Sequence, residues 1–202
     1  VTRGLFAVLL HFGYDGKYKE EIDACLRKTG ILTLKMQSVT GEIPFGGRSN
    51  QFPHNEAHLA ILMEHEANRY YREGNTGLAS AFKRAAQKAL ESITDWLSKT
   101  PIRHVKNRYP TETGYGCEKY AYFDKYMITV ASFLYVASLF CDDRIPASPA
   151  DLDTCYTLET SSHFHKLFLR SGPYFAEFDT RADPHYDASG LGRVHREGAP
   201  ST

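Results

Sequence analysis

The segment PHNEAHLAILMEHEANRYYREGN (residues 53–75) decides how the rest of the chain is arranged. Its apolar side chains recur at helical spacing and share one face: Leu59, Met63, Ala67 and Tyr70. Pro53 suits the first turn of a helix, and Gly74 suits its end. The pattern predicts a helix over residues 54–72 that packs its apolar face inward. The opposite face carries four other side chains: His54, His58, Ile61 and His65.

Helical patterns continue on both sides of this segment. Residues 3–12 predict a short apolar helix, and a second, amphipathic helix is expected from about residue 17. Residues 76–99 show the clearest apolar stripe, which is typical of an outer helix that is wet on one side. Residues 117–140 become apolar nearly all round, and this predicts an inner helix buried between layers.

Two long polar loops, residues 40–53 and 100–116, separate these helices. Their Pro and Gly residues prevent regular structure. Antiparallel helices joined in this way build bundles, solenoids and toroids, and no repeat of fixed period is present. The pattern alone therefore predicts helical layers with two elaborate loops on one side.

The last part of the chain changes to alternating apolar and polar residues. The stretch HFHKLFLRSGPYFAEFDT (residues 163–180) predicts two strands joined at residues 171–173. A short helix is expected within residues 147–156, and residues 182–202 are expected to be loop. Because two strands alone are not stable in water, we expect the chain to be part of a larger protein.

The composition argues against two classes of partner. The 24 Lys and Arg balance 24 Asp and Glu, so no basic excess indicates nucleic acid. The most apolar stretch, residues 126–140, is shorter than the roughly 20 residues of a membrane-spanning helix. The aromatic content of 13% is explained equally well by a filled core and by a sugar-binding cleft.

The first long loop ends in a dense polar cluster at the start of the helix predicted over residues 54–72. Unpaired N–H groups at such a helix start favour anionic ligands. His54, at the junction of loop and helix, is a candidate for proton transfer, and Glu56 is a candidate catalytic carboxylate. The candidate substrate-binding side chains are Arg48, Asn50, Gln51 and Asn55.

The second long loop contributes another cluster. Tyr115 lies between two glycines, which leaves its side chain free to be presented at a cleft as a general acid or base. Glu118 is a second candidate catalytic carboxylate, although acidic residues are also common at a helix start. The remaining candidates for substrate binding are Arg108, Tyr109, Glu112 and Tyr120. We expect the two loops to meet at one end of the helical layer, with His54 and Tyr115 in one cleft.

The spacing of His54, His58 and His65 resembles that of metal ligands. No carboxylate or cysteine completes a familiar metal motif, and no phosphate loop, dinucleotide fingerprint or serine-hydrolase elbow is present. We therefore expect neither a metal nor a cofactor.

Three stretches resemble bacterial proteins of the heparinase II/III-like group and related toroid polysaccharide-degrading enzymes. They are GEIPFGGRSNQFPHNEA (residues 41–57), RYPTETGYGCEKYAYFDKYM (residues 108–127) and AEFDTRADPHYDASGLGRVHR (residues 176–196). The resemblance implies a mainly α chain, part of an (α/α) toroid over residues 1–160 and the start of a β-sandwich domain over residues 161–202.

The resemblance also implies an activity. It assigns Arg48, Asn50 and Asn55 to the carboxylate of a uronate, and His54 and Tyr115 to proton transfer in β-elimination. The chain departs from the usual order of these lyases, because Asn55 follows His54 instead of preceding it.

Two alternatives stay open. A glycoside hydrolase, glucuronidase-like, would use paired carboxylates such as Glu56, Glu112 and Glu118. A helical carbohydrate-binding module would explain the aromatic residues without catalysis. The expected partner in every case is a polysaccharide or oligosaccharide. The oligomeric state is open, and so is the choice between bacterial cytoplasm and periplasm.

Overall fold

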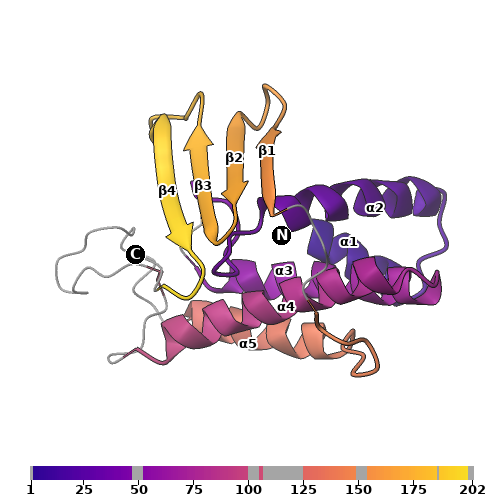
Figure 1. Cartoon of the computed structure of the whole chain (residues 1–202). Coiled ribbons are helices and arrows are strands. Elements are labelled where there is room, and N and C mark those ends of the chain that lie inside the picture. The colour runs from indigo at the N-terminus through magenta and orange to yellow at the C-terminus, as the bar shows by residue number, and fades with distance from the viewer. Residues whose placement is uncertain are drawn as a thin grey trace.

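The computed structural model describes residues 2–46, 52–99, 105–106, 125–148, 154–185 and 187–199. These residues form a layer of helices with an antiparallel sheet standing on it (Figure 1). The helices are α1 (Thr2–His11), α2 (Lys19–Met36), α3 (His54–Arg72), α4 (Thr76–Leu97) and α5 (Lys125–Ser138). The strands are β1 (Cys155–Glu159), β2 (Lys166–Ser171), β3 (Tyr174–Asp179) and β4 (Gly190–Arg196).

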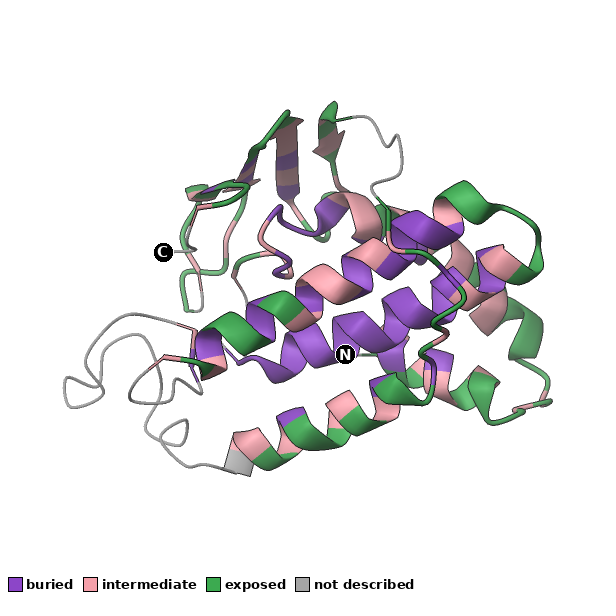
Figure 2. Cartoon of the chain, turned by 60° about the horizontal axis from the view of Figure 1, so that its bottom comes forward, coloured by how far each residue is buried: buried purple, intermediate pink, exposed green. Residues whose placement is uncertain are grey.

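Helix α3 has the bounds predicted for it and forms the centre of the helical layer. It is buried along almost its whole length, as Figure 2 shows. The turn into α4 is closed by Gly74 at φ +78° and by Asn75, whose Oδ1 accepts a hydrogen bond from the Leu78 amide at 3.1 Å. The prediction of a single inward face is too narrow, because His54, His58 and His65 on the opposite face are buried too.

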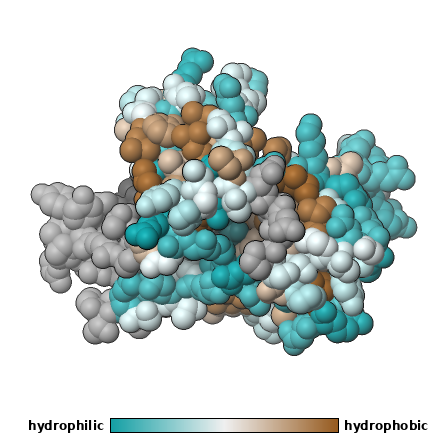
Figure 3. Space-filling model, viewed as in Figure 1, coloured by the Kyte–Doolittle hydropathy of each residue, from teal (hydrophilic) through white to brown (hydrophobic). Residues whose placement is uncertain are grey.

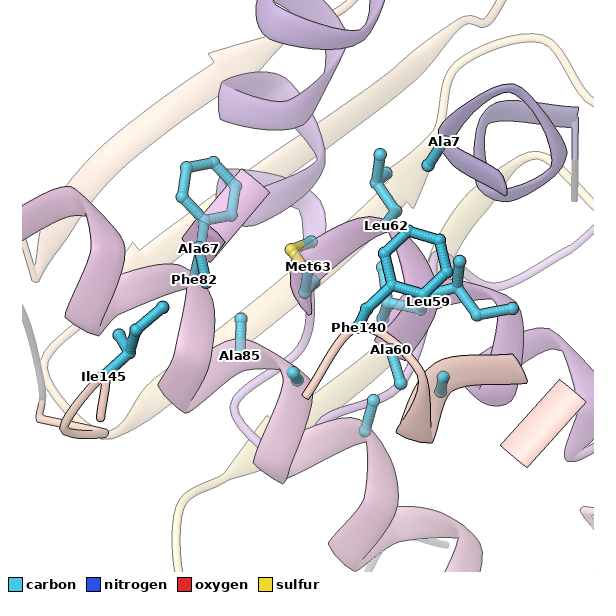
Figure 4. Packing of buried hydrophobic residues seen from close by; sticks show 14 of the residues in the cluster. Ala7, Leu59, Ala60, Leu62, Met63, Ala67, Phe82, Ala85, Phe140 and Ile145 are labelled. Carbon is cyan, nitrogen blue, oxygen red and sulfur yellow. The ribbon is translucent and has the colours of Figure 1, made fainter. Parts of the chain in front are cut away.

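The core of the layer lies between α3 and its neighbours. Met63 and Ala67 of α3 pack with Phe82 and Ala85 of α4, as Figure 4 shows. The rings of Tyr70 and Phe82 stack with their centroids 5.5 Å apart. The small side chains of Ala67 and Ala85 let α3 and α4 approach closely. The outer side of α4 is exposed to solvent, as predicted.

Helix α5 is not the inner helix that its apolar sequence predicts. It packs against α3 along one side only, and Ile128 and Tyr135 on its other side are 72% and 68% exposed. One contact between the two helices is made by His58 of α3, whose ring centroid lies 3.7 Å from that of Phe133. Described residues of the chain do not cover the outer side of α5. The predicted part of this helix over residues 117–124 lies outside the described residues.

The strands pair in the order β1-β2-β3-β4. The predicted hairpin is confirmed, with Gly172 at φ +52° between β2 and β3. The predictions of a helix reaching residue 156 and of a C-terminal loop are wrong in part, because β1 and β4 occupy these positions. Residues 149–153 lie outside the described ranges. The glycines of β4 interrupt its alternating pattern, which is why the sequence did not predict this strand. A Cβ at Gly192 would lie 3.2 Å from the Phe45 ring, so the two come close together.

One face of the sheet packs on the helices. Phe168 and Phe175 form a small core with Met36 and Val39 at the end of α2. The Tyr156 hydroxyl donates a hydrogen bond to the Lys35 carbonyl at 2.6 Å. The other face carries partly or fully exposed apolar side chains, and Figure 3 shows apolar residues gathered over the strands. They include Leu167, Leu169, Phe178, Leu191 and Val194.

Candidate functional site

A cavity of about 470 Å³ lies where the helices meet the sheet. Its helical wall comes from α1, α2 and the first turns of α3, and includes Arg3, Thr33, Asn55 and His58. Residues 43–46 of the first long loop form its rim. Its sheet wall comes from the start of β2, the end of β3 that pairs with it and the loop after β3, and includes His165, Lys166, Asp179, Asp183 and Asp187. Elements far apart in the sequence therefore contribute polar side chains to one cavity.

Two glycines allow these walls to come together. A Cβ at Gly4 would lie 3.0 Å from the His58 carbonyl oxygen and 3.3 Å from His58 Nδ1, so α1 can lie on α3 only without a side chain there. Gly46 has a φ of +89°, and a Cβ at this position would clash with the Asp187 carboxylate. The cavity therefore depends on backbone positions that no other residue type fits without movement.

The sheet wall holds a histidine bound to a carboxylate. His165 Nδ1 lies 2.7 Å from Asp179 Oδ1, which also accepts the Arg181 amide at 2.9 Å. Lys166 Nζ lies 2.7 Å from the other carboxylate oxygen, Oδ2. Burial opposes the ionisation of Asp179, but these three partners outweigh it and lower the pKa of its carboxyl. Asp179 is thus held as an anion that orients the His165 ring.

His165 also has an unusual backbone. Its φ of +44° is the one positive value among the non-glycine residues that the structure describes. Residues other than glycine adopt this region uncommonly, although histidine does so more often than most, and such positions cluster at functional sites. With Nδ1–H donated to Asp179, Nε2 is left as a proton acceptor. About a quarter of the side chain is exposed (27%), so the ring reaches the cavity.

More buried charges join the sheet to the first long loop. Lys166 Nζ lies 3.5 Å from Asp187 and 3.9 Å from Glu177. Arg193 of β4 lies 3.3 Å from Glu177 and 2.8 Å from Glu42, and also contacts the Ile43 carbonyl. Burial raises the pKa of Glu177 in spite of its cationic neighbours. This network holds the rim of the cavity against the sheet.

The helical wall contributes His58, and His54 lies one turn before it. Both are buried, and the Nδ1 atom of each has no hydrogen-bond partner in the described structure. The pKa of each is lowered to about 4, mainly by burial, and at His54 the Lys106 ammonium contributes to the shift. The His54 ring lies beside the stacked rings of Phe52 and Tyr126, whose centroids are 4.3 Å apart, and does not line the cavity, whereas His58 does. Both imidazoles are neutral near pH 7.

The two long loops meet at Glu56, in the first turn of α3. Its Oε1 lies 2.6 Å from Lys106 Nζ of the second loop and accepts the Ile43 amide of the first loop at 3.2 Å. Burial raises the pKa of Glu56, and Lys106 opposes this shift. The carboxylate has no exposed surface, so this position joins the loops and does not face the cavity.

The candidates drawn from the sequence are therefore only partly placed. His54, Asn55 and Glu56 lie together at the start of α3, and Asn55 lines the cavity. The other candidates lie outside the described residues: Arg48, Asn50, Gln51, Arg108, Tyr109, Glu112, Tyr115, Glu118 and Tyr120. The predicted proximity of His54 and Tyr115 stays a prediction, because Tyr115 lies outside the described residues.

Four residues that line the cavity were not predicted from the sequence: Arg3, His165, Lys166 and Asp179. The sequence does contain one signal for Lys166 and Asp179. A hairpin that turns at residues 171–173 places Lys166 opposite Asp179, which are partners in the observed register. An acid and a base facing each other on the buried side of a sheet mark a functional candidate.

Within the described part of the chain, no three His, Cys, Asp or Glu side chains are arranged to hold a metal ion. His65 lies near the far end of α3 from His54, where Arg69 Nη2 lies 3.2 Å from its Nε2. None of the described helices is both long enough and apolar enough to cross a membrane. No protein-family model matches the chain, and comparisons with curated proteins and with solved structures find no significant match.

Proposed function

We propose that this chain contributes to the active site of an enzyme that cleaves a uronate-containing polysaccharide or oligosaccharide by β-elimination. The observation that carries the proposal is the His165–Asp179 pair, which faces His58 and Asn55 across one cavity. An oriented proton acceptor opposite an amide and a neutral imidazole supplies groups for proton abstraction and for charge stabilisation.

The proposed reaction breaks the C5–H and C4–O4 bonds of the substrate and forms the C4–C5 double bond, with one proton taken up by the base and one given by the donor. His165 Nε2 takes the proton at C5, beside the carboxylate of the uronate. The C4–O4 bond then breaks as the C4–C5 double bond forms, and the departing oxygen takes a proton. Tyr115, from the second long loop, stays the proposed proton donor. His58 and Asn55 donate hydrogen bonds to the charge that develops on the carboxylate.

The neutral state of His58 fits this role. A histidine with a pKa near 4 does not carry a charge of its own near neutral pH. It can therefore donate a hydrogen bond from one nitrogen without repelling the neighbouring imidazoles. Binding of an anionic substrate would raise the His58 pKa, because a nearby negative charge favours the protonated form.

The proposal extends to the fold. We propose that the helical layer is part of an (α/α) toroid and that the sheet begins a β-sandwich. The apolar sides of α5 and of the sheet that the described residues leave exposed support both ideas, since such surfaces are normally covered in toroids and sandwiches.

A second candidate function is glycoside hydrolysis. It is favoured by Asp183 and Asp187, which line the same cavity as Asp179. Two carboxyl groups on either side of a glycosidic bond can act as acid and as base or nucleophile. Glu56, which the sequence suggested for this role, is enclosed in its ion pair with Lys106.

The test is turnover of uronate-containing polysaccharides, with ultraviolet absorbance and reducing ends recorded together. Elimination gives new reducing ends together with the absorbance of a C4–C5 double bond. His165→Asn, which suits the left-handed backbone, should lower kcat at least about 100-fold. His163→Asn, at an exposed position two residues away, is the matched control and should change kcat less than about twofold.

Each outcome has a separate meaning. Reducing ends without the absorbance would indicate hydrolysis and direct attention to Asp183 and Asp187. Saccharide binding without turnover would indicate a binding module. Full elimination activity in His165→Asn would refute the role of the His165–Asp179 pair.

A further inference from the structure

Arg3 differs from the other strong cation of the cavity in having no acidic partner within ion-pairing distance in the described structure. Its Nη1 donates to the Thr29 carbonyl at 3.4 Å and contacts Thr33 Oγ1, both on α2. Burial lowers the pKa of the guanidinium. A partly buried cation without a counter-charge is costly, so the position favours an anion supplied from outside.

Lys166 on the sheet wall shows the contrast. Its ammonium lies within 3.9 Å of three carboxylates, those of Asp179, Asp187 and Glu177. Asp183 adds a further carboxylate to the same wall. Among the residues of this side that line the cavity, the three carboxylates of Asp179, Asp183 and Asp187 thus outnumber the one lysine. An anionic ligand group is repelled by the sheet wall and attracted to the helical wall.

We infer that Arg3 binds the anionic group of the ligand, so that the cavity takes an acidic saccharide in one orientation. The carboxylate or sulfate lies at the helical wall on Arg3, and hydroxyl groups lie at the sheet wall on Asp183 and Asp187. This inference rests on the proposed saccharide function, and it adds the position and sign of the group that the cavity selects.

The chemistry of each wall suits this orientation. The guanidinium presents a fork of N–H donors that matches the two oxygens of a carboxylate or a sulfate. The Nη1 contacts to α2 hold it in place and leave donors on Nη2 and Nε. Ionised aspartates accept hydrogen bonds from sugar hydroxyls. The cavity of about 470 Å³ falls within the roughly 300–1,000 Å³ of small-molecule sites.

The test is calorimetric titration of the protein with three probes: glucuronate, glucose 6-sulfate and glucose. The wild-type protein should bind glucuronate at least tenfold more tightly than glucose, or ~1.4 kcal/mol. Arg3→Gln should remove this preference and leave the glucose affinity unchanged. Arg84→Gln, which removes the same charge from an exposed pair with Glu91, should keep it. An equal preference for the sulfate would assign the site to oxyanions in general, and a preference for glucuronate alone would assign it to uronates.

Three results would overturn the inference. They are a preference that persists in Arg3→Gln, no preference in the wild-type protein, and a lower melting temperature of Arg3→Gln with equal loss of all probes. The last result would give Arg3 a structural role, whereas removal of an uncompensated charge should leave the melting temperature unchanged or higher. The binding assay needs no turnover. A preference that depends on Arg3 in a protein without elimination activity would therefore support the inference while the proposed function fails.

Discussion

Lys106 and Glu56 form a buried ion pair, with 2.6 Å between Nζ and Oε1. The pair ties the second long loop to the first turn of α3, and Ile43 of the first loop donates its amide to the same oxygen. Their side chains are 5% and 0% exposed, so neither charge is hydrated. Both long loops are therefore bound to the start of α3 through the Glu56 carboxylate.

Removing one partner of this pair should be strongly destabilising. Lys106→Met leaves the buried Glu56 without its cation, and we expect unfolding in urea to show a loss of about 3–5 kcal/mol. The double variant Lys106→Met with Glu56→Gln should recover most of that loss, because no unpaired charge remains. A loss below about 1 kcal/mol for the single variant would mean that water or another group reaches Glu56.

Asp179→Asn should show whether activity depends on the orientation of the His165 ring, because this variant keeps the histidine and changes only its partner. An amide can donate to Nδ1 and so favours the tautomer with its proton on Nε2, which cannot accept a proton from substrate. We expect kcat to fall by about 10²–10⁴-fold, while KM changes little. The control is Asp95→Asn on the exposed side of α4, which should leave both constants unchanged. Equal kcat values for Asp179→Asn and wild-type protein would contradict the orienting role.

The buried histidines should make the protein sensitive to mild acid. Burial lowers the pKa of His54, His58 and His195 to about 4, well below the value of about 6.5 in an unfolded chain. Between these two values the unfolded state binds protons that the folded state does not, so stability falls as the pH falls. Each such histidine contributes a slope of up to ~1.4 kcal/mol per pH unit. The effect is absent above about pH 7.

His58→Gln checks this slope. Urea unfolding between pH 7 and pH 4 should give a shallower loss of stability for His58→Gln than for the wild-type protein. His163→Gln, at an exposed position, should leave the slope as it is. Identical slopes for all three proteins would show that His58 is protonated in the folded state.

Glu66 should act in the opposite direction. It is fully buried on α3, its carboxylate oxygens accept no hydrogen bond in the described structure, and the nearest cation is Arg69 at 3.6 Å. Burial raises its pKa to about 7, so the folded state keeps a proton that the unfolded state loses above about pH 4.5. Stability from this group is full below pH 4.5 and is lost as the pH rises through 7. Glu66→Gln should therefore raise the free energy of unfolding at pH 8 by about 1–3 kcal/mol, with little change at pH 4.5. A destabilised Glu66→Gln at pH 8 would contradict the shift.

The helices could be predicted where local pattern and packing agree. α3 matches its predicted bounds because proline before it and glycine after it act through the backbone alone. α5 was wrongly predicted to be an inner helix. An apolar sequence shows that a helix has surface to bury, but it does not show which other elements cover that surface. β4 was missed because its two glycines interrupt the apolar alternation, and the close approach of Gly192 to Phe45 is a tertiary contact that no local rule contains.

Of the described residues that line the cavity, only Asn55 was predicted from the sequence. His54, Asn55 and Glu56 stood out because they are polar, adjacent and at a helix start. His165 and Asp179 are separated by a hairpin, and Arg3 reaches the cavity only because Gly4 lets α1 approach α3. Packing between helices and strands brings these side chains together. The cavity could therefore not be predicted from the sequence before the register of the strands was known.

The left-handed backbone at His165 sets two selective pressures against each other. Glycine and asparagine adopt this conformation more easily than histidine does, so a library of variants at position 165 screened only for folding should become enriched in those two residues. A library screened for turnover should return histidine. Sequencing the variants that survive each screen would therefore show whether folding or catalysis determines the residue at position 165.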